Sequence, residues 1–419
     1  MRYIQLRENS SAGKNKKLTA SLVGVIVTLC LISFIYSQSF VTTLPTSSFA
    51  PIRRTIQSLS PISEVTDRTN VSADIEQVLE EQRAEIEKEL KDYKFPNRKY
   101  NISAKPLDNL VPEKGGKPVR SIIIATWRSG STFLGDILNS VPGNFYHYEP
   151  LLDHGIVQVR GPPLSTKSLT YIRKLLNCNY TGMNSYLEFG VDHVYLFSHN
   201  VRLWNKCATY PHICFHAPFL NKYCSLFPFQ SMKLVRLRLN LIEELLQDPN
   251  LGIRVLLVVR DPRGTMQSRK HRDWCPGFPD CSDPALVCAD MVSDYSAAVR
   301  FKKKYPNTFR VLRYEDFSIN PYKGTEQLFK FFGLEFTHHV KKYLDTHTKI
   351  NAGGVSSTYR NSSYAPFHWR TDLDHKEVLK IQKSCKTAMS IWGYVKANNI
   401  SHQRKFNPIL PNFDLKFIP

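Results

Sequence analysis

Residues 121–140 read SIIIATWRSGSTFLGDILNS: an apolar β-branched run, a short turn and a stretch with helical spacing. The turn is rich in small hydroxylated residues and contains one basic residue and one glycine; its members are Thr126, Trp127, Arg128, Ser129, Gly130, Ser131 and Thr132. A strand that leads through such a turn into a helix presents backbone N–H groups to an anion. It is not a Walker A motif, since the first glycine is absent and the basic residue precedes the glycine. The segment predicts an anion-binding loop, and an ordinary capped turn is the alternative.

Other apolar runs alternate with helical stretches along the rest of the chain. Runs typical of strands are SIIIAT (121–126), KLVRLR (233–238), RVLLVV (254–259) and FRVLRYE (309–315), and helical stretches are FLGDILNS (133–140), LIEELLQ (241–247), DMVSDYSAAVRFKKKY (290–305) and GTEQLFKFFG (324–333). Buried runs alternating with helices indicate a mostly parallel sheet covered on both faces. We therefore predict an α/β fold with a P-loop-like parallel sheet. Because ligands in such sheets bind at the carboxyl ends of strands, the loops after residues 126 and 260 are candidate sites.

The second candidate loop follows the apolar run that ends at residue 259. Its residues are Arg260, Asp261, Pro262, Arg263, Gly264, Thr265, Met266, Gln267 and Ser268. Pro262 suits the first turn of a helix, and Ser268 would lie about two turns later. Arginines beside a helix-borne hydroxyl suit a second phosphate, although Arg-Asp-Pro-Arg also fits a local ion-pair turn.

The N-terminal region predicts a membrane anchor. Residues 1–17 carry five basic residues and one acid, and residues 18–36 carry no charge. At ~1.5 Å per residue, the uncharged stretch spans ~28 Å, about the thickness of one hydrocarbon core. The basic flank keeps the N-terminus cytosolic, so the rest of the chain would be luminal. We predict a type II membrane protein with a tail (1–17), a transmembrane signal anchor (18–36), a luminal stem (37–117) and a luminal catalytic domain (118–419).

Other features agree with a luminal location. Eight of the nine cysteines follow the anchor, and an even number in an oxidising compartment favours disulfides. Glycosylation sequons occur at Asn70, Asn101, Asn179, Asn361 and Asn399. Lysine and arginine outnumber acidic residues by 56 to 36, a net charge of +20 that favours anionic partners. In the lumen, nucleic acid is disfavoured among them.

Three further patterns each have two interpretations. Residues 74–93 have apolar side chains at helical spacing, interrupted by Gln82 and Glu89, and form either a solvated helix or a short coiled coil that makes the stem a homodimer. The sequence HICFH (212–216), near Cys207 and Cys224, suggests zinc, but disulfides are favoured in an oxidising lumen. The Asp-Leu-Asp at 372–374 is similar to the D-x-D of metal-dependent glycosyltransferases and also suits a helix cap.

Together the two loops resemble those of a known family. TWRSGSTFL, from residue 126, and VVRDPRGTMQSR, from residue 258, are similar to the 5′-phosphosulfate and 3′-phosphate loops of Golgi carbohydrate sulfotransferases that sulfate the 6-hydroxyl of galactose, GalNAc or GlcNAc. The similarity covers about residues 120–395 through YHYEPL (146–151), RYEDF (313–317), NPYKGTEQLFKFFGL (320–334) and a YRNSS…WR…C…WGY pattern that ends at Tyr394. Gly264 departs from it, because many members carry a small apolar residue there.

The resemblance implies roles for both loops. Thr126 to Thr132 would hold the 5′-phosphosulfate of 3′-phosphoadenosine 5′-phosphosulfate (PAPS), with Arg128 in the role that a lysine has in cytosolic sulfotransferases. Arg260 and Ser268 would bind the 3′-phosphate. Sulfuryl transfer resembles phosphoryl transfer, in which positioning and fixed positive charge provide most of the catalysis. Since sulfate carries less charge than phosphate, we expect Arg128 to suffice without a metal.

The loops supply no base for the acceptor hydroxyl. A sugar 6-hydroxyl is a weak nucleophile, so a nearby group must accept its proton. Glu149 follows the first loop by one helix, where a short strand would return to the same sheet edge, and the resemblance to heparan-type sulfotransferases also indicates a glutamate. His147, which would share a strand face with Glu149, is the alternative base, and a structural role for Glu149 is a third interpretation.

The sequence therefore predicts a Golgi enzyme that transfers sulfate from PAPS to a sugar 6-hydroxyl in a glycoprotein or proteoglycan. N-acetylglucosamine is the first expectation for the acceptor, with galactose and GalNAc as rivals. The alternatives are a Golgi glycosyltransferase and a non-catalytic glycan-binding protein on the same fold. Because both loops lie beyond residue 120, we expect a fragment from about residue 100 onward to be active.

Overall fold

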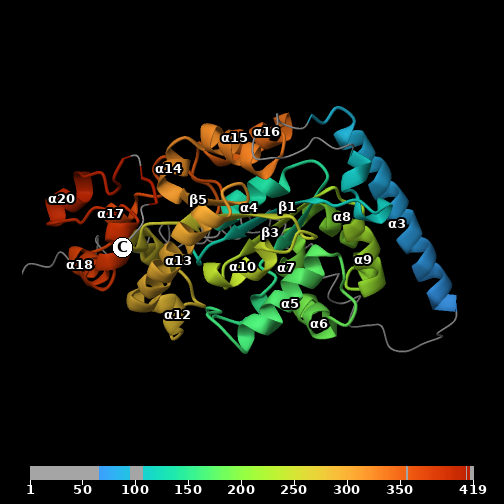
Figure 1. Ribbon diagram of the computed structural model, residues 1–419, viewed down its shortest axis with the longest axis horizontal. Helices are drawn as coiled ribbons and strands as arrows, with labels where there is room; N and C mark the ends of the chain where they lie inside the picture. Colours follow the sequence, from blue (N-terminus) through green and yellow to red (C-terminus); the bar gives the residue numbers. More distant parts are fainter. Residues whose placement is uncertain (1–65, 95–106, 355–356, 412, 416–419) are drawn as a thin grey trace, which may run out of the picture. The chain divides into compact units, whose positions relative to one another are not determined.

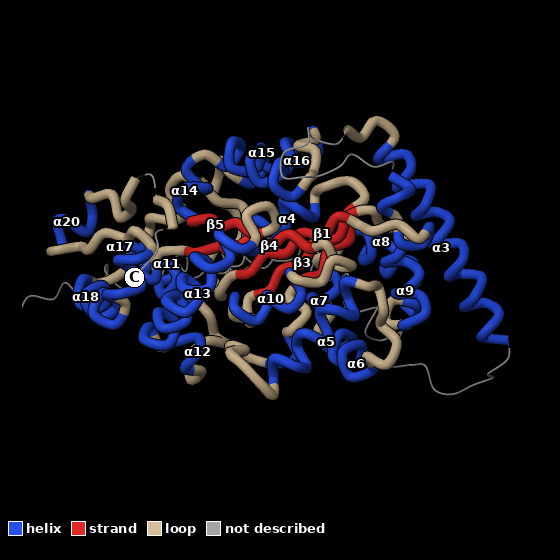
Figure 2. The backbone as a smooth tube through the Cα atoms, in the orientation of Figure 1, coloured by secondary structure: helices blue, strands red, loops and turns tan. Residues whose placement is uncertain are grey.

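The computed structural model describes residues 66–94, 107–354, 357–411 and 413–415. Five parallel strands form a sheet in the order β2-β3-β1-β4-β5 (Figure 2). The strands are β1 (Val119–Ile124), β2 (Asn144–Tyr148), β3 (Phe229–Leu234), β4 (Ile253–Val259) and β5 (Phe309–Arg313). The predicted α/β fold with a parallel sheet is confirmed.

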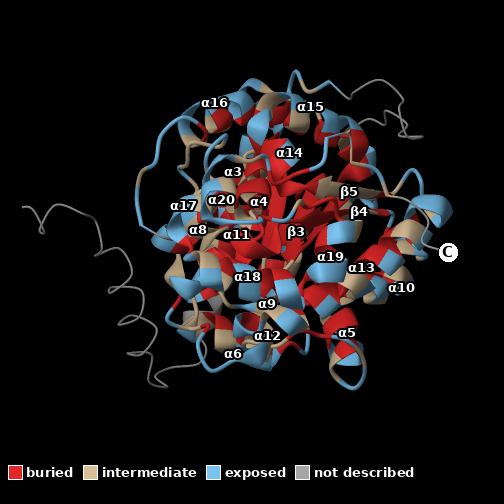
Figure 3. Ribbon diagram, turned by 90° about the vertical axis from the view of Figure 1, so that its left-hand side faces the viewer, coloured by how far each residue is buried: buried red, intermediate tan, exposed pale blue. Residues whose placement is uncertain are grey.

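Helices cover both faces of this sheet (Figure 1). The α-helices are α3 (Thr66–Leu90), α4 (Ser131–Asn139), α5 (Leu164–Leu176), α6 (Asn184–Asp192), α7 (Tyr195–Ser198), α8 (Val201–Thr209), α9 (Ala217–Ser225), α10 (Glu243–Leu246), α11 (Pro262–Lys270), α12 (Pro279–Ser282), α13 (Pro284–Lys304), α14 (Tyr314–Ile319), α15 (Pro321–Phe332), α16 (His338–His347), α17 (Trp369–Asp372), α18 (His375–Ser384), α19 (Lys386–Ile391) and α20 (Ile400–Lys405). Short 3-10 helices are η2 (Leu107–Leu110), η3 (Pro112–Lys114), η4 (Leu152–His154), η5 (Pro211–Ile213) and η6 (Leu239–Ile242). Helices α4, α15 and α16 lie on one face, and α10 and α13 lie on the other. Buried residues are concentrated in the sheet and on the inner sides of the helices (Figure 3).

One predicted strand is displaced. The run KLVRLR (233–238) was expected to be a strand, but β3 begins at Phe229 and ends at Leu234. The displacement arises because β3 is buried along its whole length despite its polar residues. Each polar side chain is satisfied by a distant partner: Gln230 accepts from Arg120, and Ser231 accepts from Asn144.

Helix α3 begins earlier than predicted and packs against the rest of the domain. Five of its apolar residues are buried, namely Ile75, Val78, Leu79, Ile86 and Leu90. Gln82, which interrupts the expected coiled-coil seam, accepts a hydrogen bond of 2.5 Å from Tyr223 Oη on α9. The seam is therefore occupied within the chain. The helix is therefore neither solvated on all sides nor free to form a coiled coil through this seam, and the homodimer itself stays a prediction.

The predicted disulfides are confirmed. Four of them join Cys178 to Cys224, Cys207 to Cys214, Cys275 to Cys281 and Cys288 to Cys385. The zinc alternative at HICFH is wrong, because the cysteines that it needs are cross-linked and His212 Nε2 lies 2.9 Å from Asp74 Oδ2. The described residues contain no helix that is long and apolar enough to cross a bilayer. The predicted tail, the anchor at 18–36 and the stem up to residue 65 lie outside them.

Candidate functional site

The first predicted loop connects β1 to α4 in a fixed conformation. Arg128 and Gly130 have positive φ angles of 69° and 86°. Only glycine adopts this region without strain, and a Cβ at position 130 would also overlap the ring of Tyr314. Helix α4 begins directly after Gly130, so the unpaired N–H groups of its first turn are available beside the loop.

The seven predicted loop residues divide into two groups. Arg128, Gly130, Ser131 and Thr132 line a pocket, whereas Thr126, Trp127 and Ser129 do not. The second group stabilises the turn: Ser129 Oγ donates to the carbonyl of Thr126 (2.7 Å), and Arg269 donates to Thr126 Oγ1 (2.7 Å) and to the carbonyl of Trp127 (3.1 Å).

The second predicted loop connects β4 to α11. It contains the ion-pair turn and also residues that face the pocket. Asp261 caps α11, accepting from the backbone N–H of Arg263, and its Oδ2 lies 2.7 Å from Arg263 Nη2, with both side chains fully buried. This is the ion-pair turn. Pro262, Thr265 and Met266 are also buried and lie outside the pocket lining. Of this loop, Arg260, Gln267 and Ser268 line the pocket.

Close packing explains why position 264 is a glycine in this chain. A Cβ at this position would lie 3.1 Å from Trp369 Cδ1 and 3.2 Å from Arg260 Nε. The glycine therefore allows the Arg260 side chain to pack tightly across α11.

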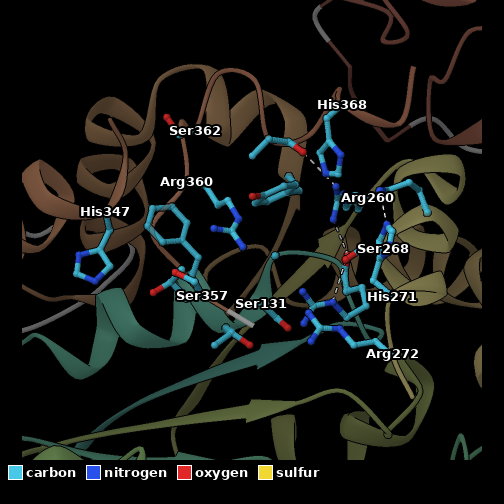
Figure 4. A pocket seen from close by; sticks show the side chains of 18 residues that line it. Ser131, Arg260, Ser268, His271, Arg272, His347, Ser357, Arg360, Ser362 and His368 are labelled. Atoms are coloured by element: carbon cyan, nitrogen blue, oxygen red, sulfur yellow. Dashed lines mark hydrogen bonds between the residues drawn. The ribbon is translucent and has the colours of Figure 1, made fainter. Parts of the chain in front are cut away.

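The two loops are in direct contact at one pocket (Figure 4). Arg128 Nε donates to Ser268 Oγ (3.0 Å), and Arg260 Nη1 donates to the carbonyl of Arg128 (2.8 Å). Arg272 lies beside Ser268, and Arg360 reaches the pocket from the C-terminal segment. Of the described residues that line this pocket, none is acidic.

Burial shapes the electrostatics of the pocket. Burial and the neighbouring charges of Arg272 and Arg260 lower the pKa of Arg128 to about 10, which leaves it charged at neutral pH. Arg260 is almost fully buried, and its Nε has no hydrogen-bond partner. A buried donor without a partner, beside a turn with two positive φ angles and with cations on several sides, suits a ligand with more than one anionic group.

Known proteins match this chain over most of its length. The sulfotransferase domain family matches residues 118–393. The chain belongs to the sulfotransferase family. Carbohydrate sulfotransferase 4 of Mus musculus is 24% identical over 332 residues, covering 70% of this chain and 86% of the relative. Carbohydrate sulfotransferase 1 of Mus musculus is 25% identical over 348 residues, covering 69% and 85%. Among solved structures, sulfotransferase STF9 from Mycobacterium avium aligns at 15% identity with a TM-score of 0.33, covering 83% of this chain and 92% of that one.

In this sulfotransferase, Glu149 lies at the end of β2 in a buried cluster of charges. Its two oxygens accept from Lys233 Nζ and Arg236 Nη1, each at 2.7 Å. Burial alone would raise the pKa of Glu149, but Lys233 and Arg236 lower it to about 2. Lys233 Nζ also donates to Thr132 Oγ1 (3.1 Å) and lies 3.8 Å from the centre of the Tyr148 ring. Lys233 thus connects Glu149 to the first loop.

His147 does not share a face with Glu149, and that prediction is wrong. The ring of His147 is buried against Phe145, 4.9 Å between centroids, where burial and Arg120 lower its pKa to about 3. Glu149 has a φ of 40°, and its carboxylate reaches Lys233, which lies over Tyr148 on the other face. Strand alternation holds only while the backbone is extended, and β2 ends at Tyr148.

Several residues of the sulfotransferase pocket were missed from the sequence. They are Tyr314, His271, Arg272, His347, Ser357, Thr358, Arg360, Ser362, Ala365 and His368. The YRNSS pattern, which includes Arg360 and Ser362, and RYEDF, which includes Tyr314, were part of the family resemblance but carried no assigned role. The family resemblance of these two segments was the sequence signal that could have identified their pocket residues.

The Asp-Leu-Asp segment is structural in this sulfotransferase. Asp374 stands at the N-cap position of α18, and Asp372 Oδ2 accepts from Gln267 Nε2 (3.0 Å). Among the residues that the structure describes, there is no cluster of His, Cys, Asp or Glu side chains suited to a metal ion.

Proposed function

We propose that this protein transfers the sulfuryl group of PAPS to the 6-hydroxyl of a sugar in a glycoprotein or proteoglycan chain. The observation that carries the proposal is the contact of two anion-binding loops at one pocket through Arg128, Ser268 and Arg260. The names of the carbohydrate sulfotransferase relatives support a sugar acceptor and favour sulfate transfer over sugar transfer. The 6-position and the preference for N-acetylglucosamine over galactose or GalNAc rest on the resemblance of the loops.

The residues present fit PAPS. Gly130 gives the loop its positive φ with the Tyr314 ring packed against it, and Arg260 Nε is a buried donor with no partner in the protein. PAPS supplies an activated sulfuryl group on its 5′-phosphate. Arg128, Ser131, Thr132 and the first turn of α4 bind and orient that end, and Arg128 stabilises the charge that develops there. Arg260 and Ser268 bind the 3′-phosphate, and no metal takes part.

Glu149 is the proposed base. Its carboxylate is ionised at neutral pH, since its pKa is about 2. Each carboxylate oxygen has two lone pairs, so an oxygen that already accepts from Lys233 or Arg236 can accept another hydrogen. Lys233, beside Thr132, provides a positive charge in addition to that of Arg128.

The protein is further proposed to be a single-pass type II protein of the Golgi membrane, anchored by residues 18–36 with the catalytic domain in the lumen. The four disulfides support an oxidising compartment. The proposed partners are a glycan acceptor and the membrane.

The direct test is transfer of radiolabelled sulfate from PAPS to a panel of defined oligosaccharides, with the sulfated position mapped. We expect label at a sugar 6-hydroxyl and the same rate with EDTA present. Loss of transfer on chelation, with recovery on adding manganese, would contradict the metal-free proposal. Incorporation of sugar from a nucleotide sugar, with no sulfate transfer, would favour the glycosyltransferase alternative.

The role of Arg260 has its own test. We expect Arg260→Ala to weaken binding of PAPS and of its desulfated product alike by roughly 10- to 150-fold, because both carry the 3′-phosphate and a charge-assisted contact contributes ~1.5–3 kcal/mol. Ser268→Ala should cost less, since it removes a neutral donor. Arg300→Ala is the control, because Arg300 is half exposed and pairs with Glu243. Calorimetric titration measures each affinity. Equal affinity of the unmodified protein for nucleotides with and without the 3′-phosphate would overturn the assignment.

A further inference from the structure

One histidine of the pocket is oriented by a carboxylate. His368 immediately precedes α17 and lines the pocket that the two loops form. Its Nδ1 lies 2.7 Å from Asp372 Oδ2. Because an ionised carboxylate can only accept a hydrogen bond, the proton of the neutral ring lies on Nδ1, and Nε2 carries none. Asp372 thereby sets both the tautomer and the direction of the His368 ring.

The carboxylate of Asp372 is itself fixed at both oxygens. Gln267 Nε2 donates to Oδ2 (3.0 Å), and Thr371 Oγ1 donates to Oδ1 (3.1 Å). Gln267 Nε2 also lies 3.1 Å from Nε2 of His271, a second histidine of the pocket. Among the residues that the structure describes, Nε2 of His368 has no hydrogen-bond partner. This nitrogen is therefore available to a ligand in the pocket.

His368 lies on the side of the pocket that contains Arg260. Figure 4 shows its ring beside the Arg260 side chain. The carbonyl of Ala365, three residues earlier, accepts from Arg260 Nη2 (3.3 Å). Trp369, the next residue, lies under the guanidinium of Arg263, 4.2 Å from the centre of its ring. The backbone around His368 is thus tied to the loop that the proposed function assigns to the 3′-phosphate.

The charged and titratable groups around His368 come from three segments. They are Arg260 after β4, His271 after α11, and Asp372 and Tyr364 from the segment of His368 itself. Burial lowers the pKa of His368 below its ordinary value, and the charges of Arg260 and His271 act in the same direction, against Asp372. Without a bound anion, the ring is therefore neutral at neutral pH.

A phosphate group next to Arg260 would reverse this balance. An opposite charge within ~4–6 Å favours the charged form of a histidine. The protonated ring would then donate a charge-assisted hydrogen bond from Nε2 to the phosphate. A lysine or an arginine at position 368 would repel Arg260 even without a ligand. A histidine adds its charge only together with the anion.

We propose that His368, oriented by Asp372, is a further binding residue for the 3′-phosphate and binds this group in its imidazolium form. The inference rests on the proposed function and adds a regulation to it, because nucleotide binding then takes up a proton. Bound phosphate raises the pKa of His368, so the contribution of His368 to affinity is absent at a pH above the raised value. This contribution grows as the pH falls and is complete below the pKa of the ligand-free protein.

Calorimetric titration of the full-length protein with adenosine 3′,5′-bisphosphate, the desulfated product, tests this between about pH 5 and 8. A phosphate monoester itself gains a proton near pH ~6. The quantity to compare is therefore the dissociation constant of the variant divided by that of the unmodified protein at the same pH. We expect this ratio for His368→Gln to be about 10 at the acid end and to approach one at the alkaline end.

The chain offers a matched control. His212 also pairs with an aspartate, Asp74, and the two histidines are similarly exposed, with 32% and 29% of the side chain accessible for His212 and His368. His212 does not line the pocket. The ratio for His212→Gln should therefore stay near one at every pH.

Two further variants separate charge from structure. His368→Lys is charged throughout this pH range, so it should bind the nucleotide at the alkaline end more tightly than His368→Gln does. Asp372→Asn should move the rise in affinity to lower pH, because the imidazolium loses its carboxylate partner. Calorimetry in buffers of different ionisation enthalpy measures proton uptake directly. Uptake should be smaller in His368→Gln than in the unmodified protein, a difference that a merely structural role would not produce.

A ratio for His368→Gln that does not change with pH, or equal proton uptake in both proteins, would overturn the inference while leaving nucleotide binding intact. Adenosine 5′-phosphosulfate, which lacks the 3′-phosphate, should bind His368→Gln and the unmodified protein equally well. A similar loss of affinity for this nucleotide would overturn the assignment to the 3′-phosphate. Failure of the unmodified protein to bind either nucleotide at any pH would contradict the proposed function itself.

Discussion

Glu149→Gln is expected to lower turnover by ~100-fold or more, the usual size of general-base catalysis, while PAPS binding persists. The amide cannot take the proton that the attacking hydroxyl must lose. Single-turnover transfer and nucleotide titration separate the two effects. His147→Asn is the matched control, since His147 lies on the opposite face of the sheet, and it should retain near-normal turnover. Near-normal turnover in Glu149→Gln would show that the carboxylate is structural.

The same substitution should also destabilise the fold. It leaves Lys233 and Arg236 buried without their shared anion, and breaking a buried pair costs ~3–5 kcal/mol. Because the pKa of Glu149 falls from 4.5 to about 2 on folding, its contribution to stability is complete above pH 4.5 and is lost as the pH falls toward 2. The variant should therefore show a weaker loss of stability between pH 4.5 and 2, measured by denaturant unfolding.

A double variant distinguishes catalysis from charge balance. Glu149→Gln with Arg236→Met removes one cation together with the anion and leaves Lys233 beside Thr132. We expect it to recover part of the lost stability but not the turnover. Recovery of both would assign Glu149 to charge balance alone.

Removal of α3 is expected to prevent stable folding. A chain that begins at residue 107 loses five buried apolar side chains and exposes their partners on α9. At ~1.5–3 kcal/mol for each fully buried side chain, the loss is comparable with the ~5–15 kcal/mol that stabilises a typical domain. A chain that begins at residue 61 keeps the helix and should unfold cooperatively.

Soluble yield and thermal unfolding of the two fragments check this prediction. It replaces the sequence-based expectation that a fragment from about residue 100 suffices. That expectation considered only where the loops lie and not what covers the domain. Identical unfolding temperatures for the two fragments would contradict the structural role of α3.

Local sequence signals were enough for the two loops and for β1, β4 and β5. Each of these elements is defined by neighbours in the chain: an apolar run followed by a glycine turn or by a proline-initiated helix. The same reasoning misplaced β3, because Gln230 and Ser231 look exposed until their partners far away in the sequence are known. Side-chain hydrogen bonds between residues far apart in the sequence leave no periodic pattern in it.

For the site, the sequence predicted the two loops but not the side-chain directions around Glu149. The strand argument that placed His147 beside Glu149 assumed extended backbone, and one positive φ angle reversed it. The packing of α3 was ambiguous for a related reason. An apolar helical stripe indicates that something covers it, but the stripe is the same whether the cover is a second chain or α9 of the same chain.

The disulfide between Cys288 and Cys385 has a consequence for the chain entropy of the pocket. It closes a ring across a sequence separation of 97 residues. Eight of the pocket residues lie inside this ring: Tyr314, His347, Ser357, Thr358, Arg360, Ser362, Ala365 and His368. In the chain-entropy treatment, a bridge across ~100 residues lowers the conformational entropy of the unfolded chain. This loss stabilises the folded state by about 4.7 kcal/mol at 25 °C. The C-terminal wall of the pocket therefore stays covalently tied to α13 even when its non-covalent contacts are broken. An oxidising compartment, which preserves this disulfide, thus limits how far the residues of the anion site can separate.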